Sequence, residues 1–147
     1  MLIAVATRQR AECLGRHVGA VLVREGRIVA TGYNGTPRGF PRCNADEQGC
    51  HRCAHREQYP SGSAYDVCIC VHAEQNAIVF AARHGSGTAG GTLYTTLRPC
   101  FGCAKEAIQA GVREIVFAEP FVYQPDLEEI YERLIRESGL ILRQGGA

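Results

Sequence analysis

Two short stretches, far apart in the sequence, constrain this chain more than any other feature. The first is His72-Ala73-Glu74 and the second is Pro99-Cys100-Phe101-Gly102-Cys103. One imidazole and two thiols supply three zinc ligands, the number that a catalytic zinc uses when water fills its fourth position. Cys100 and Cys103 are one helical turn apart, so both sulfurs can face the same ion. The fold therefore has to bring His72 to that turn.

Glu74 is the expected acid–base group of such a site. It lies two residues from the histidine, and a bound zinc lowers the pKa of its water to about 7, so a nearby carboxylate could take the proton. A Cys-x-x-Cys pair alone is also typical of structural zinc sites and redox pairs. Both halves, however, lie where helices are expected to start, with a proline before the second. Together they predict a catalytic zinc held by His72, Cys100 and Cys103.

The composition narrows the class of protein. The chain has 147 residues, with 16 basic and 15 acidic side chains and a formal charge of +1. Nucleic-acid binding is disfavoured because such proteins usually carry a basic excess, and a small-molecule substrate is favoured. No apolar run of about 18 residues indicates a membrane span. The first residues lack a signal-peptide core, so we expect a cytoplasmic protein. There, eight cysteines indicate metal binding rather than a secreted disulfide framework.

Hydrophobic periodicity and helix-end signals predict one α/β domain over residues 1–147. Because strands alternate with helices, we expect a mixed five-stranded sheet with parallel crossovers, flanked by helices. Gly26 is expected in the turn of a first hairpin. The predicted helices cover 2–13, 73–82, 100–110 and 125–137, and the predicted strands cover 18–23, 28–33, 92–96, 113–117 and 140–143.

A cysteine-rich insert at about 40–68 interrupts this pattern. It shows little periodicity, and so long an irregular segment needs something to hold it, which a metal would provide. A second, closed structural zinc site would use Cys13, Cys43, Cys68 and one of Cys50 or Cys53. Two alternatives stay open: a ligand from His51 or His55, or plain buried cysteines. Cys70 is assigned to the core.

The pattern His-x-Glu followed by Pro-Cys-x-x-Cys is the known signature of zinc nucleobase deaminases. Beyond it, the chain resembles the deoxycytidylate (dCMP) deaminases of the cytidine and deoxycytidylate deaminase superfamily over nearly its whole length. The resemblance rests on residues 31–39, 71–78, 92–96 and 99–105, of which Gly32-Tyr33-Asn34-Gly35 is the most discriminating. It implies a three-layer fold and zinc-dependent conversion of dCMP to dUMP and ammonia. It also implies a homo-oligomer, often a hexamer, and in many members control by dCTP and dTTP with magnesium.

The same resemblance assigns substrate contacts. Asn34 would bind the sugar, Arg38 would lie near the phosphate, and the backbone N–H of Ala73 would face the base. The simpler interpretation is a turn at Asn34 and a solvated charge at Arg38. Arg98, before Pro99, departs from the family, which more often has a small or uncharged residue there.

Rival functions remain. Within the deaminases, the substrate could be a free base or nucleoside such as cytosine, cytidine or guanine; a tRNA adenosine deaminase fits less well. From another class, a competence-associated zinc protein without catalysis is the alternative. Glu74 favours an enzyme, since a purely structural site does not need it.

Overall fold

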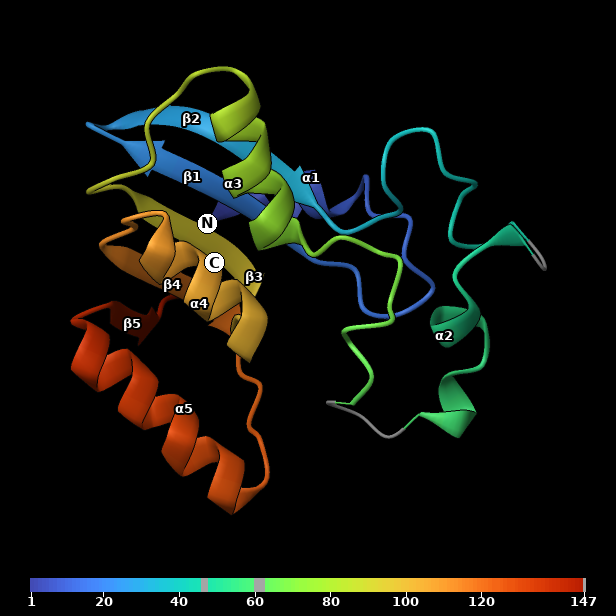
Figure 1. The fold of residues 1–147 in the computed structure, drawn as a ribbon. Coiled ribbons are helices and arrows are strands. Elements are labelled where there is room, and N and C mark those ends of the chain that lie inside the picture. Colours follow the sequence, from blue (N-terminus) through green and yellow to red (C-terminus); the bar gives the residue numbers. More distant parts are fainter. Residues whose placement is uncertain (46–47, 60–62, 147) are drawn as a thin grey trace.

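The computed structural model describes residues 1–45, 48–59 and 63–146, and these build one mixed five-stranded sheet (Figure 1). The strand order is β2-β1-β3-β4-β5, with β1 antiparallel to both neighbours and β3, β4 and β5 parallel. The predicted sheet is confirmed. The strands are β1 (Gly19–Arg24), β2 (Arg27–Tyr33), β3 (Thr92–Leu97), β4 (Glu114–Glu119) and β5 (Ile141–Gln144). The helices are α1 (Leu2–Arg8), α2 (His51–Ala54), the 3-10 turn η2 (Arg56–Gln58), α3 (Ala73–Arg83), α4 (Phe101–Gln109) and α5 (Pro125–Ser138).

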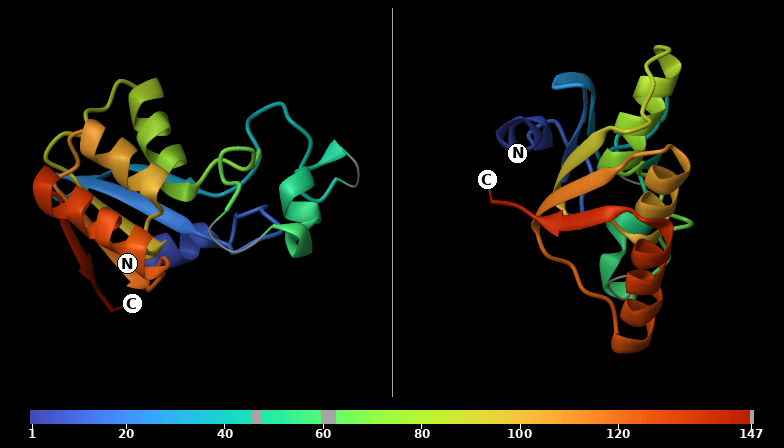
Figure 2. Two further views of the ribbon diagram at one scale, coloured as in Figure 1. Left: turned by 60° about the horizontal axis from the view of Figure 1, so that its bottom comes forward. Right: turned by 90° about the vertical axis from the view of Figure 1, so that its left-hand side faces the viewer.

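Helices cover both faces of the sheet. Figure 2 shows α1 on one face and α3, α4 and α5 on the other, which gives three layers. Fully buried alanines of α3 and α4, among them Ala77 and Ala107, pack against Leu22 and Leu93 of the strands. Small helix residues let the helices approach the sheet closely, so the starts of α3 and α4 lie near each other at one edge of the layer.

The β1–β2 hairpin turns as the sequence predicts. Glu25 and Gly26 have φ values of 52° and 73°, both in the left-handed region. Two such residues in succession form the turn whose twist matches that of the flanking strands. The pairing of β2 with β1 is therefore set by the turn between them.

Gly32 of β2 determines how closely α3 can approach. A Cβ at this position would overlap the carbonyl oxygen of Ala73 in the first turn of α3. Only glycine allows this contact, and Asn76 then donates from Nδ2 to the Tyr33 carbonyl oxygen at 2.8 Å. These contacts fix the start of α3, which is the position of His72.

The first helix is shorter than predicted. It was expected over 2–13, but α1 ends at Arg8. The reason is tertiary: the N–H of Glu12 donates to the carbonyl oxygen of Asn34 at 3.0 Å, which draws the chain out of the helix. Cys13 thereby lies in an irregular loop beside the insert.

The cysteine-rich insert projects from the end of the layers beyond α3 (Figure 1). Its chain leaves and returns at adjacent points, because Gly35 and Val71 form an isolated bridge. The helices α2 and η2 of the insert are each less than two turns long. Across the described residues, no helix is both long and apolar enough to cross a membrane.

Candidate active site

The two halves of the sequence motif meet at two helix starts. His72 is the N-cap of α3 and Cys100 is the N-cap of α4. The His72 N–H donates to Gln75 Oε1 at 2.9 Å, and Gln75 Nε2 donates to Glu106 Oε1 of α4 at 2.8 Å. The side chain of Gln75 thus links the start of α3 to the second turn of α4.

His72, Cys100 and Cys103 form a group of ligand atoms that lie within 4.8 Å of one another. His72 Nδ1 is 3.4 Å from each of the two sulfurs. For a tetrahedral zinc with ordinary bond lengths, the nitrogen–sulfur edge is about 3.6 Å. The three residues therefore fit a zinc ion with one position left for water or substrate.

The imidazole of His72 and the thiol of Cys100 each favour the charged form of the other. The hydrogen bond with Cys100, opposed by burial, raises the pKa of His72 to about 9. Hydrogen bonds from Cys103 and His72 lower the pKa of Cys100 to about 4, which makes it a thiolate at neutral pH. Thiolate is the form that binds metal. The positive end of the α4 dipole lies at the same sulfur and favours the same charge.

Glu74 points into the site from the first turn of α3. It is 4% exposed, and burial raises the pKa of its carboxyl group. Thr95 Oγ1 donates to Oε1 at 3.3 Å, and the Cys103 thiol lies 3.6 Å from Oε2. A carboxyl group with a raised pKa next to a metal site suits proton transfer in both directions. Sequence reasoning missed Thr95, which is fully buried on β3.

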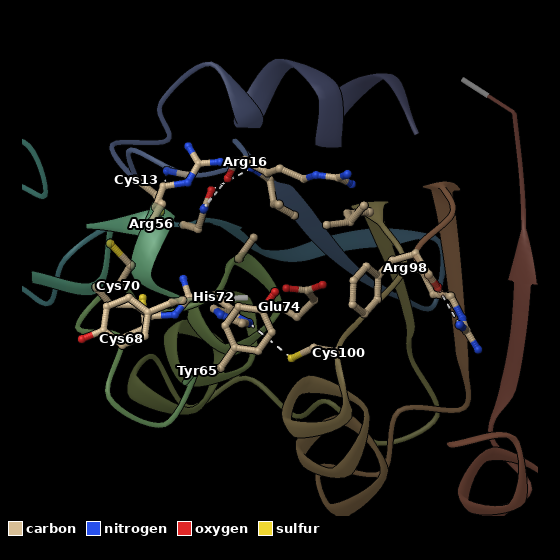
Figure 3. Close-up of a pocket in the computed structure, with 18 residues that line it drawn as sticks. Cys13, Arg16, Arg56, Tyr65, Cys68, Cys70, His72, Glu74, Arg98 and Cys100 are labelled. Carbon is tan, nitrogen blue, oxygen red and sulfur yellow. Dashed lines mark hydrogen bonds between the residues drawn. The ribbon is translucent and has the colours of Figure 1, made fainter. Parts of the chain in front are cut away.

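A cavity of about 310 Å³ opens beside these residues (Figure 3). This is the size of a pocket for one small ligand. Among the described lining residues Glu74 is the one carboxylate, while four are arginines: Arg16, Arg52, Arg56 and Arg98. These arginines give part of the cavity wall a positive charge that suits an anionic substrate.

The insert places two of these arginines. Arg52 of α2 lies over the ring of Tyr65, 4.5 Å from its centroid, and donates to the Ser63 carbonyl oxygen. Arg56 of η2 donates to the Leu14 carbonyl oxygen at 2.9 Å. Neither forms an ion pair with a described carboxylate, nor does Arg16. No local sequence signal marks these three residues, because the fold of the insert brings them to the cavity.

Of the three residues that the resemblance assigned to substrate contacts, two line the cavity and one does not. Asn34 and Ala73 line the cavity. The amide of Asn34 already accepts from Val18 N–H and donates to the Arg16 carbonyl oxygen, both at 2.7 Å, so it fixes the loop that carries Arg16. Arg38 is exposed and does not line the cavity. Phe40 N–H donates to the Pro37 carbonyl oxygen at 3.0 Å and closes the turn that contains Arg38. The contact of Arg38 with a phosphate stays a prediction.

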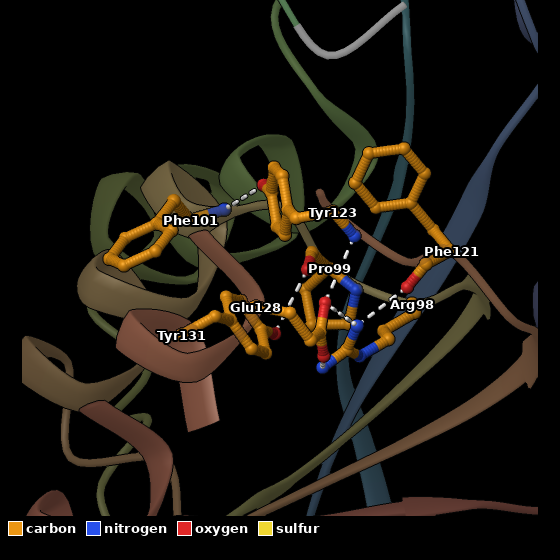
Figure 4. A network of polar contacts seen from close by, with 7 residues as sticks. All are labelled: Arg98, Pro99, Phe101, Phe121, Tyr123, Glu128 and Tyr131. Carbon is orange, nitrogen blue, oxygen red and sulfur yellow. Dashed lines mark hydrogen bonds and ion pairs between the residues drawn. The ribbon is translucent and has the colours of Figure 1, made fainter. Parts of the chain in front are cut away.

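Arg98 lies at the rim and stabilises the turn that leads into Cys100 (Figure 4). Its guanidinium pairs with both oxygens of Glu128 on α5, at 2.5 and 3.1 Å, and lies 4.4 Å from the Tyr131 ring centroid. Tyr131 in turn donates to the Pro99 carbonyl oxygen at 2.9 Å. The unusual arginine thus ties α5 to the metal-binding turn.

The remaining six cysteines gather where the insert meets the loop after α1. They form two groups of four. Within each group, the sulfurs all lie within 4.8 Å of one another, and Cys70 belongs to both groups. Cys70, which was assigned to the core, is buried, and its neighbours in that core are thiols. His51 and His55 belong to neither group, and their rings contact each other instead. The groups are Cys13, Cys43, Cys53 and Cys70, and Cys50, Cys53, Cys68 and Cys70.

Comparison with known proteins agrees with this geometry. The family model for the cytidine and deoxycytidylate deaminase zinc-binding region matches residues 1–119, and the chain belongs to this family. The chain is 38% identical over 144 residues to the deoxycytidylate deaminase of Schizosaccharomyces pombe, covering 98% of this chain but 42% of that protein. It is thus similar to less than half the length of that relative.

Shorter relatives match over more of their length. The deoxycytidylate deaminase of Enterobacteria phage T4 is 36% identical over 152 residues, covering 81% of this chain and 75% of that protein. A crystal structure of dCMP deaminase from the cyanophage S-TIM5 with dCMP and dUMP superposes with a TM-score of 0.73 at 26% identity. It covers 98% of this chain and 92% of that chain. The predicted family and fold are confirmed.

Proposed function

We propose that this protein converts dCMP and water to dUMP and ammonia. The observation that carries the proposal is that a three-ligand metal site and a buried carboxyl group lie at one cavity, together with three arginines that form no ion pair with a described carboxylate. The metal site and Glu74 suit hydrolytic deamination of a nucleobase. The arginines favour a phosphorylated substrate over a free base or nucleoside.

His72, Cys100 and Cys103 would hold the zinc. When bound, zinc acts as a Lewis acid that makes water a nucleophile near neutral pH. Glu74 accepts the proton of the attacking water and delivers it to the ring nitrogen, and then a proton to the leaving amine. The C4–N bond breaks as the C4 carbonyl forms, so the products are dUMP and ammonia. The backbone N–H of Ala73, at the start of α3, faces the base.

The Glu74 role is tested by Glu74→Gln, which keeps the shape of the side chain but cannot accept the proton. We expect bound zinc to be retained and ammonia release to fall by a factor of at least about 100. Turnover near that of the unmodified protein would contradict the assignment. The same ammonia-release assay on dCMP, CMP, deoxycytidine, cytosine and guanine tests the substrate. A lack of clear preference for dCMP would refute it, and no deamination at all would favour a non-catalytic zinc protein.

We further propose that Arg16 and Arg56 bind the 5′-phosphate, with Arg52 beside them. Arg56→Gln should raise KM for dCMP and leave turnover of deoxycytidine unchanged, because only dCMP carries the charge. Arg38→Gln is the matched control, since Arg38 is an exposed arginine outside the cavity. If Arg38→Gln raises KM and Arg56→Gln does not, the phosphate contact belongs to Arg38 instead.

The insert would carry structural zinc, since buried Cys₄ groups are typical of closed zinc sites. All eight cysteines are free, which fits a reducing cytoplasm. The family resemblance implies a homo-oligomer, and this stays a prediction. Light scattering of the purified protein would give its size, including whether it is a hexamer. Control by dCTP and dTTP with magnesium stays a prediction, to be tested by adding each to the activity assay.

A further inference from the structure

The six cysteines around the insert fall into two groups of four that share two members. Each group of four contains Cys53 and Cys70. Cys13 and Cys43 complete one group, and Cys50 and Cys68 complete the other. No group joins the first of these pairs to the second. A single ion would leave two of the six thiols without a metal.

The sulfur–sulfur distances match zinc coordination. They are 3.6 Å between Cys13 and Cys53, 3.7 Å between Cys53 and Cys68, and 3.8 Å between Cys50 and Cys68. A tetrahedral zinc with Zn–S bonds of about 2.3 Å has edges of about 3.8 Å. A disulfide, at about 2.05 Å, is far shorter. In iron–sulfur clusters each cysteine thiolate binds a different iron or pairs on one of several irons joined by inorganic sulfide, whereas each group here is compact enough for one ion.

We propose that the insert binds two zinc ions in a binuclear centre, with Cys53 and Cys70 bridging them. This inference deepens the structural zinc of the proposed function. One ion would bind Cys13 and Cys43 with the bridging pair, and the other Cys50 and Cys68 with the same pair.

Charge permits the second ion. One zinc with four thiolates carries a net charge of −2, and two zincs with six thiolates also carry −2. The second ion therefore replaces two thiol protons without adding net charge. Backbone N–H groups already face the outer ligands: Leu14 donates to Cys43 and Gly15 to Cys13, each at 3.3 Å. Such donors stabilise thiolates.

The packing around these thiols shows why the insert needs the ions. Five of the six cysteines are buried and form a core of their own, with Ile69 and Cys68 packed against it. Among the described residues of this cluster, Ile69 is the one aliphatic side chain. Helices as short as α2 do not persist without tertiary contacts. The centre would replace the missing apolar core and would hold Arg52 and Arg56 at the cavity.

Native mass spectrometry of the full chain, purified from zinc-supplemented cells, tests the proposal directly. We expect three zinc ions per chain: one at His72, Cys100 and Cys103, and two at the thiols. A count of two that falls to one in His72→Ala would refute the binuclear centre but leave a single structural zinc, and a count of one that falls to zero in His72→Ala would refute both. Bound iron or acid-labile sulfide at the thiols would also refute it. Three zincs without dCMP deamination would instead refute the proposed substrate alone.

Variants separate bridging from terminal ligands. Cys43→Ser should lower the count by one, Cys70→Ser should lower it by two, and His72→Ala should remove only the catalytic ion. If Cys70→Ser does not fold, cadmium-113 NMR of the unmodified protein replaces it. Two sulfur-coordinated cadmium signals that are spin-coupled through shared thiolates would support the proposal. Two uncoupled signals would refute the bridge.

Discussion

The contact between Arg98 and Glu128 offers a sharp test of how the metal-binding turn is held. Both side chains are nearly buried, at 11% and 17% exposure, and the pair has two-point geometry. Breaking a fully buried ion pair by removing one partner costs about 3–5 kcal/mol, and hydrogen bonds to charged groups contribute about 1.5–3 kcal/mol. Because some solvent reaches this pair, we expect Glu128→Gln to lower the free energy of unfolding by about 2–3 kcal/mol.

Urea unfolding at pH 7 gives this value, and α5 supplies the control. Arg133 and Glu137 form an exposed pair at 3.7 Å with 66% and 65% exposure. Glu137→Gln should change stability little, because exposed pairs contribute little. Adding Arg98→Met completes a double-mutant cycle, in which the two losses should not add. If Glu128→Gln is no more destabilising than Glu137→Gln, the interpretation of Arg98 as the anchor of the turn is refuted.

The pH dependence follows from the same contact. Hydrogen bonding from Arg98 lowers the pKa of Glu128 below its ordinary value. A lowered folded-state pKa stabilises the protein above the unfolded-state value, and this contribution is lost as the pH falls through the folded-state value. The stability difference between Glu128→Gln and the unmodified protein should therefore shrink below about pH 4. A difference that grows in acid would contradict this sign.

Three further outcomes follow from the contacts described. Gly32→Ala should destabilise the fold by about 1–3 kcal/mol or more, because the added Cβ would meet the Ala73 carbonyl oxygen. It should also weaken zinc retention. A free energy of unfolding in urea equal to that of the unmodified protein would contradict the close approach of α3 to β2. Asn34→Ala removes two hydrogen bonds of 2.7 Å that hold the loop of Arg16. We expect it to lower stability by about 1–3 kcal/mol and to raise KM for dCMP, and an unchanged KM would show that the loop is held by other contacts. Dialysis against a chelator should abolish ammonia release, and added zinc should restore it; activity that survives complete metal removal would exclude a zinc mechanism.

Local sequence signals were sufficient to predict most of the helices and strands. The starts of α3 and α4 follow from a histidine and a cysteine that precede alanine-rich segments, with a proline before the cysteine. Gly26 marked the hairpin because two-residue turns need left-handed residues. The candidate catalytic group of His72, Glu74, Cys100 and Cys103 could be predicted because its residue types and spacing match those of a zinc deaminase site.

Other features depend on neighbours that are distant in sequence. The first helix stops at Arg8 because Asn34 binds the chain beyond it. The position of Cys70 among thiols, and of Arg56 at the cavity, depends on how an irregular insert folds. Arg98 could be recognised as unusual, but its partner Glu128 lies on another helix, and no periodicity links the two.

The bridge between Gly35 and Val71 has a consequence for how this family could diversify. Their backbone groups exchange two hydrogen bonds, of 3.2 and 2.9 Å, so the insert begins and ends at one point of the scaffold. A segment with adjacent ends can be lengthened, shortened or exchanged without moving the strands, because loop closure costs rise only slowly with length. The residues proposed to carry out deamination lie outside this segment, at the starts of α3 and α4. Exchange of one module at a fixed attachment point could therefore alter substrate choice while the reaction itself is inherited unchanged.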